Sequence, residues 1–213
     1  MTMSVLRKIT GQIRPYMDEN GYTFSQNYFY KIHNDIAYGL ELEMPRKLVY
    51  ATFFVIPLYI PCKNRYFTYG NRVSKPMSLS KNASEDELDV WCARLRQHLQ
   101  KTIFPFFEKI DSPGKLAKQI EKKKYAALLA CNPVQIARLQ LFSYLYAEDF
   151  DSLHSLIRKY PQLVQESAFL TERVRNIYLE EKDTVDQLTQ QDVETVRTFC
   201  AKTIEETIRN CFG

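Results

Sequence analysis

The stretch LVYATFFVIPLYIP, residues 48–61, is an almost uninterrupted apolar run that ends in proline. A membrane-spanning helix needs about 20 apolar residues, and this run is shorter than that. It also carries Pro57 among β-branched and aromatic residues, which favours a strand over a helix. Both alternating sets of side chains are apolar, so the sequence predicts a strand that is covered on both faces. No membrane partner is expected.

The residues before this run supply partner strands. Residues 28–32 and 36–42 alternate between apolar and more polar side chains, as half-buried strands do. Asn34 and Asp35 lie between them and tolerate the left-handed conformation that a tight hairpin needs. The sequence therefore predicts an antiparallel meander of three strands, with a possible fourth strand at residues 65–73.

A helix is predicted before the sheet. Val5, Ile9, Ile13 and Met17 recur at helical spacing within residues 4–20. Pro15 is expected to break or kink this helix, and Gly21 is placed to end it.

A second helix is predicted after the sheet, over residues 84–110. Ser84 and Glu87 have the spacing of a capping box, and the apolar stripe that follows includes Trp91. The acidic residues of the first turn suit the positive end of a helix dipole, and we do not interpret them as a metal site. We expect this helix and the N-terminal helix to pack on the sheet.

The second half of the chain has helical periodicity throughout. A short basic helix is expected within residues 111–125, and Pro133 is expected to open a helical hairpin that Pro161 stops. Residues 189–212 are expected to form a helix whose narrow apolar seam suits either its own domain or a homodimer. The fold class is therefore α+β, with an α+β domain at residues 1–125 and a helical region at residues 126–213.

Sequence motifs for chemistry are absent. The six glycines are too far apart for a phosphate-binding loop, and no metal-binding spacing occurs among the three histidines and five cysteines. The pair Glu41 and Glu43 fits a solvated strand face as well as acid–base chemistry. No cofactor, metal or catalytic residue is predicted. An odd number of cysteines and no apolar leader run predict a cytoplasmic protein.

Charge is unevenly distributed along the chain. Residues 1–125 hold 20 Lys and Arg against 12 Asp and Glu, and residues 126–213 hold 9 against 13. This asymmetry indicates either an anionic partner for the first half or two parts of the chain that complement each other in charge. In the segment 63–75, cations alternate with aromatic rings, a pattern that suits single-stranded nucleic acid or another anion. The candidate binding residues are Lys63, Arg65, Tyr66, Tyr69, Arg72 and Lys75. A loop whose rings fold onto the sheet is the alternative interpretation.

The order of these elements resembles a bacterial family of small α+β domains of unknown function. The stretches that carry the resemblance are PYMDENGYTFSQNYFYKI, ATFFVIPLYIP and ELDVWCARLRQHLQKTIFPFFEKI, within residues 5–125. Gly21-Tyr22 stands where the family pattern has Gly-Phe. The resemblance implies the fold and supplies no catalytic residues.

Three functions are compatible with the sequence. The first is a non-catalytic cytoplasmic protein-binding module, of which bacterial immunity or toxin-neutralising proteins are one instance by analogy. The second is a nucleic-acid or anion binder that uses the segment 63–75. The third is an enzyme whose residues are scattered along the chain.

Overall fold

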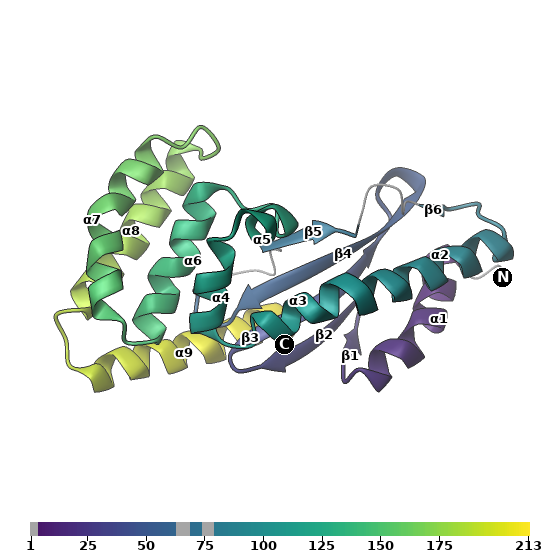
Figure 1. Cartoon of the computed structure of the whole chain (residues 1–213), viewed down its shortest axis with the longest axis horizontal. Coiled ribbons are helices and arrows are strands. Elements are labelled where there is room, and N and C mark those ends of the chain that lie inside the picture. The colour runs from purple at the N-terminus through teal and green to yellow at the C-terminus, as the bar shows by residue number, and fades with distance from the viewer. Residues whose placement is uncertain (1–3, 63–68, 74–78) are drawn as a thin grey trace.

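The computed structural model describes residues 4–62, 69–73 and 79–213 (Figure 1). Its sheet is antiparallel and runs in the order β1-β2-β3-β4-β5, with β6 also paired to β4. The strands are β1 (Thr23–Ser25), β2 (Tyr28–His33), β3 (Ile36–Glu43), β4 (Leu48–Pro57), β5 (Tyr69–Arg72) and β6 (Leu79–Ser80). The predicted α+β class and the meander are confirmed, and β1 and β6 extend the sheet beyond the predicted strands.

The hairpin between β2 and β3 turns at the predicted residues. Asn34 and Asp35 have φ values of 46° and 59°, the left-handed region that two-residue hairpin turns require. This turn pairs His33 with Ile36 and sets the register of the two strands. The long apolar run becomes β4, and residues 50–57 of β4 pair with the whole length of β3.

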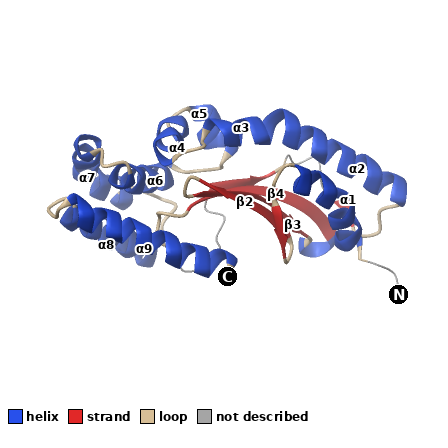
Figure 2. Ribbon diagram, turned by 90° about the horizontal axis from the view of Figure 1, so that it is seen from below, coloured by secondary structure: helices blue, strands red, loops and turns tan. Residues whose placement is uncertain are grey.

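The first face of the sheet is covered by helices that precede and follow it in sequence. Figure 2 shows α1 (Val5–Glu19), α2 (Glu85–His98) and α3 (Phe104–Lys109) on the same side of the sheet. Their buried side chains form one cluster with Phe53 and Val55 of β4. Pro15 was expected to break or kink the first helix; it does not break it, because α1 continues through Pro15 to Glu19. Gly21, at φ 79°, follows the end of α1 as predicted.

The predicted helix over residues 84–110 is divided in two. Its capping box is present, since Ser84 accepts from the Glu87 backbone and the Glu87 carboxylate accepts from the Ser84 N–H. A π-helical turn, Leu99–Ile103, separates α2 from α3. Pro105 lies in the first turn of α3 and has no N–H to give to the helical ladder, which accounts for the irregularity.

The rest of the chain is helical. The helices are α4 (Pro113–Ile120), α5 (Lys123–Leu128), α6 (Pro133–Tyr146), α7 (Phe150–Gln165), α8 (Glu172–Leu188) and α9 (Val193–Phe212). Pro133 opens α6 as predicted, but Pro161 does not stop α7, which continues to Gln165. Throughout the described ranges, the helices are too short or too polar to span a membrane.

The second face of the sheet is covered in part by α9. Ile204, Ile208 and Phe212 pack against a separate cluster that includes Phe54 and Ile56 of β4. β4 is therefore covered on both sides, as its sequence predicts. The seam of α9 that could have formed a homodimer is used within the chain, because Cys200 and Cys211 on it are also buried.

A buried ion pair fixes the helical region to the end of β4. Arg138 of α6 donates to both carboxylate oxygens of Glu181 of α8, at 2.6 Å each. Arg138 also donates to the Pro61 carbonyl at 3.2 Å. One hydrophobic cluster extends from Ile9 to Cys200, while the boundary between residues 125 and 126 stays a prediction.

A candidate binding cleft between β2 and α3

The predicted binding segment is only partly described. Lys63, Arg65, Tyr66 and Lys75 lie outside the described residues. Tyr69 is in the core at 3% exposure, and its hydroxyl donates to the Gln135 carbonyl at 3.2 Å. Burial raises the pKa of this hydroxyl. The Tyr69 ring therefore joins β5 to α6 and is not available to stack on a ligand.

Arg72 lies on the second face of the sheet, where it is half exposed. Its Nε donates to the Glu43 carboxylate at 3.1 Å, and its guanidinium lies 4.0 Å from the centroid of the Tyr50 ring. Thr52 donates to the same carboxylate, and Glu41 accepts from Asn27. Both glutamates are thus engaged in hydrogen bonds across the sheet, which favours the solvated-face interpretation.

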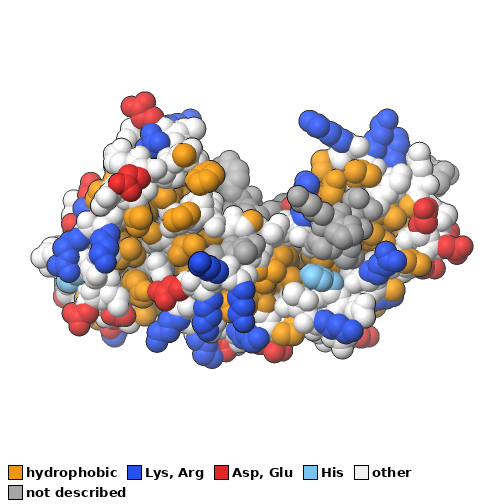
Figure 3. Space-filling view, turned by 45° about the horizontal axis from the view of Figure 1, so that its top comes forward, with side chains coloured by type: hydrophobic (Ala, Val, Ile, Leu, Met, Phe, Trp, Pro, Cys, Tyr) orange, Lys and Arg blue, Asp and Glu red, His pale blue; other side chains and the backbone are white. Residues whose placement is uncertain are grey.

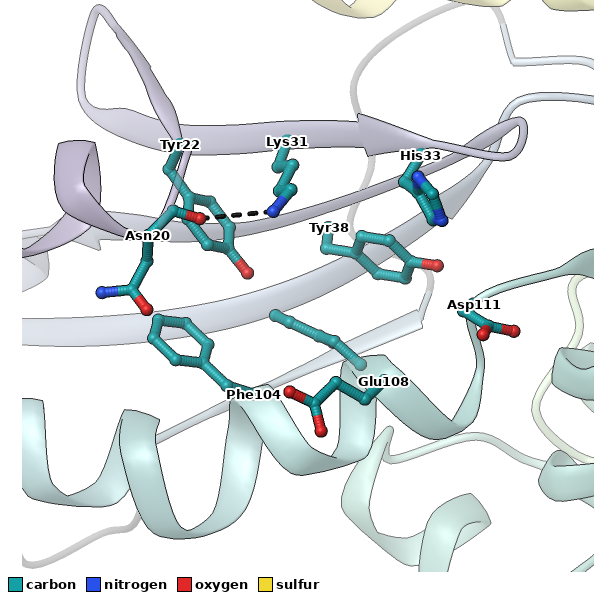
Figure 4. A pocket seen from close by; sticks show the side chains of 9 residues that line it. Asn20, Tyr22, Lys31, His33, Tyr38, Phe104, Glu108 and Asp111 are labelled. Carbon is teal, nitrogen blue, oxygen red and sulfur yellow. Dashed lines mark hydrogen bonds between the residues drawn. The ribbon is translucent and has the colours of Figure 1, made fainter.

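A cleft of about 350 Å³ opens elsewhere, between β2 and α3. Figure 4 shows that the side chains around it, such as Tyr22, Lys31 and Tyr38, come from three parts of the chain. These parts are the end of α1 with the following turn, the β2–β3 hairpin, and α3 with the turn after it. They are Asn20, Tyr22, Lys31, His33, Tyr38, Phe104, Phe107, Glu108 and Asp111.

Two pairs of aromatic rings form the floor of the cleft. Tyr22 stacks on Phe104 with a centroid distance of 5.4 Å, and Tyr38 contacts Phe107 at 5.0 Å. The positive φ of Gly21 reverses the chain after α1, which brings Tyr22 over α3. The π-helical turn precedes Phe104, so the irregularity around Pro105 helps to set how the rings of α3 face the sheet.

The two walls carry opposite charges. Lys31 and His33 project from β2, whereas Glu108 and Asp111 lie on and just after α3 (Figure 4). The Lys31 ammonium donates to the Asn20 carbonyl at 3.3 Å. The Asp111 carboxylate accepts from Lys115 at 2.9 Å. Glu108 and His33 are exposed at the mouth of the cleft.

Hydrogen bonds hold the hairpin against the end of α3. The Tyr38 hydroxyl donates to the Ile110 carbonyl at 2.9 Å, and the Asn34 side chain donates to the Asp111 carbonyl at 2.9 Å. Burial raises the pKa of Tyr38, and the nearby Asp111 charge raises it further. Burial likewise raises the pKa of Tyr22. Both phenols therefore stay protonated and neutral at physiological pH, when they can act only as hydrogen-bonding groups.

The cleft can bind a ligand with an apolar group and charged ends. Its volume is within the range of small-molecule and side-chain sites, and its apolar floor has few polar groups around it. Within the described ranges, no group of three or more His, Cys, Asp and Glu side chains could hold a metal ion. Sequence reasoning gave Lys31, His33 and Glu108 no role in a site, because only the tertiary fold brings residues 20–38 to residues 104–111.

Comparisons of the chain with protein-family models, with curated proteins and with solved structures find no match. The resemblance to a bacterial family of small α+β domains therefore stays a prediction, and the function has to be argued from geometry.

Proposed function

We propose that the protein is a non-catalytic protein-binding module, and that its cleft receives a segment of a partner protein. The observation that carries this proposal is the aromatic floor between two walls of opposite charge. Interfaces between proteins combine an apolar, often aromatic centre with a polar rim. The buried rings of Tyr22, Tyr38 and Phe107 supply that centre, and Lys31 and Glu108 supply the rim.

The chemistry of the cleft defines the partner segment. An aromatic or long aliphatic side chain fits the floor, where stacking on a ring adds to the apolar area it buries. An acidic group on one side of that anchor would face Lys31, and a basic group on the other side would face Glu108. Such complementary charges fix orientation and raise the association rate more than they raise affinity.

The neighbouring strand edge suits an extended segment. β1 pairs with β2 only as far as Tyr30, opposite Thr23. Residues 31–33 of β2 therefore have no described strand partner on that side. A peptide added along this edge gains main-chain hydrogen bonds, and its alternate side chains point into the cleft.

Catalysis has less support in this cleft. A catalytic site needs a group whose proton affinity suits transfer near the working pH. The clear pKa perturbations at this site belong to Tyr22 and Tyr38, and both are upward shifts caused first by burial. An upward shift moves a phenol further from proton transfer at neutral pH.

Selection of peptides on the wild-type protein from a displayed random library tests the proposal. The double substitution Lys31→Glu/Glu108→Lys exchanges the charges of the two walls and leaves the net charge unchanged. Selected peptides should bind this variant at least about tenfold more weakly, a change of about 1.4 kcal/mol. A matched exchange on exposed residues of α9, Lys202→Glu/Glu205→Lys, should leave binding unchanged. Peptides that bind both variants equally well would show that the cleft is not the binding site.

A further inference from the structure

Seven exposed lysines lie on the π-helical turn, at the end of α3, and on α4, α5 and the turn between them. They are Lys101, Lys109, Lys115, Lys118, Lys122, Lys123 and Lys124, and we call them the lysine face. Residues 101–124 contain three acidic residues, so the excess of four positive charges here equals the formal net charge of the whole chain, +4. Figure 3 shows Lys and Arg side chains gathered in the lower middle of the view, with few acidic side chains among them.

Most of this charge is not neutralised within the chain. Among the residues that the structure describes, Lys115 is the one lysine of the face in an ion pair, which it forms with Asp111. Lys122 donates to the neutral side chain of Gln119, and Lys124 lies over the Tyr125 ring at 4.7 Å. Lys109 also lies beside the Tyr125 hydroxyl. Lys101, Lys118 and Lys123 are exposed, so a polyanion could reach them.

The pKa of Tyr125 indicates a positive electrostatic potential at the lysine face. Burial opposes ionisation of its phenol, but hydrogen bonds and charge from Lys124 and Lys109 outweigh that effect and lower its pKa. The same positive field would favour any anion that approaches this face. Helix packing fixes the arrangement, because Leu116 and Ile120 of α4 are fully buried beneath the lysines.

The face lacks the groups that a protein or a bilayer would use. The exposed large apolar side chains of the described chain are Ile32, Met44, Leu48, Val90, Phe169, Ile177 and Val193, and all lie outside residues 99–130. A protein interface would need apolar anchors at its centre. A helix adsorbed to lipid buries its apolar side in the membrane, whereas α4 buries its apolar side in the core.

Single strands are also disfavoured by the composition of the face. Proteins that bind them stack bases on exposed aromatic rings, and Tyr125 is only 8% exposed. A duplex keeps its bases stacked inside and presents its phosphates outside, so a protein surface can bind a duplex with cations and without aromatic rings.

We propose that the lysine face binds the phosphate backbone of duplex nucleic acid without sequence preference. This site is distinct from the cleft and does not depend on the function proposed for it.

The salt dependence of duplex binding gives the expected magnitude. Each phosphate contact contributes about −0.9 to the slope of log affinity against log salt, so about four contacts give a slope of about −3.6. Raising salt from about 50 mM to about 200 mM should then weaken binding roughly 150-fold. The starting affinity should lie in the micromolar range that is typical of non-specific complexes.

Fluorescence anisotropy with a labelled duplex of mixed sequence tests this proposal. Lys122→Gln/Lys123→Gln/Lys124→Gln should weaken binding and reduce the slope by about 2–3. The control Lys81→Gln/Lys159→Gln/Lys202→Gln removes the same charge from exposed positions elsewhere and should keep the wild-type slope. Circular dichroism of all three proteins confirms folding.

Three results would overturn the proposal. The first is no measurable binding of the duplex by the folded wild type at about 50 mM salt. The second is an equal loss of duplex affinity in both triple variants, because binding would then depend on the net charge of the protein and not on the position of these lysines. The third is lysine-dependent sedimentation with phosphatidylserine vesicles in the absence of duplex binding, which would assign the face to an anionic membrane. Each of these leaves the peptide-binding test of the cleft unaffected.

Discussion

Replacing Gly39 with alanine is expected to destabilise the protein strongly. Gly39 pairs with Phe54 in the centre of the sheet, where the Phe54 ring lies across it. An alanine Cβ would stand 2.1 Å from the Phe54 Cζ and 2.4 Å from the Phe29 carbonyl oxygen. The ring could turn away only by disturbing its packing against α9, and the carbonyl is part of the backbone of β2.

The magnitude follows from the cost of overpacking. Inserting atoms into a well-packed core typically costs about 1–3 kcal/mol. The upper end applies here because one of the two contacts is with backbone, so we expect a loss of about 3 kcal/mol. For a chain of this size, that loss lowers the melting temperature by roughly 6–12 °C.

Urea unfolding followed by circular dichroism measures this loss, with Gly11→Ala as the matched control. Gly11 is inside α1, and an added Cβ there meets no atom within 4 Å. Alanine at an open helical position is favoured over glycine by up to about 1 kcal/mol, so the control should stabilise the protein. A Gly39→Ala variant within about 0.5 kcal/mol of the wild type would refute the packing described for the second face.

Three further predictions concern a largely buried ion pair, a half-buried tyrosine and two buried thiols. Arg138→Met should cost about 3 kcal/mol in urea unfolding because Glu181 is left buried without its partner, and adding Glu181→Leu should recover most of the loss; equal costs for both variants would contradict this. Burial first, and then Asp35, raise the pKa of Tyr146 to about 12. The folded state therefore holds this proton more tightly, so stability should fall between about pH 10 and pH 12, and Tyr146→Phe should reduce that fall. Burial raises the pKa of Cys92 and of Cys200 to about 11, so iodoacetamide should label neither thiol at neutral pH until the protein unfolds; labelling in the native state would contradict their burial.

The sheet could be predicted because its residues specify it locally. The apolar run of β4 indicates burial on both faces whatever covers them, and Asn34 and Asp35 favour their turn by conformational preference alone. What covers the second face could not be predicted in the same way. From the sequence, the apolar seam of α9 could pack equally well against its own domain or against a second chain. Only the fold shows that Ile208 packs on the sheet.

The missed and misplaced elements have physical explanations. No separate helix was delimited at residues 172–188 within the region predicted to be helical, because α8 buries fully only Val185 and leaves Ile177 exposed, so few buried positions define its bounds. Proline at 161 was expected to end a helix, yet α7 tolerates it inside. A helix can accommodate the lost hydrogen bond when tertiary packing holds both sides, as the buried Tyr160 and Val164 do here.

The candidate sites differ in how far the sequence reveals them. The lysines at 122–124 are visible as a run, although their exposure and the lack of an acidic partner among the described residues are properties of the fold. The cleft has no local signal at all, since an unremarkable lysine on a strand and an unremarkable glutamate on a helix become opposite walls only when the hairpin docks on α3. Binding sites built from distant segments are in general hidden from single-sequence patterns.

The two proposed sites meet at one ion pair. Asp111 lines the cleft, and its carboxylate also forms the ion pair with Lys115 of the lysine face. A partner segment that draws the Asp111 carboxylate into the cleft would free the Lys115 ammonium for phosphate, so occupation of one site would strengthen the other. Such coupling is reciprocal, and the factor must be the same in both directions. The variants chosen for the two tests leave Asp111 and Lys115 unchanged, so each test reports on its own site. The coupling can then be measured as the change in affinity for one ligand when the other ligand is also present.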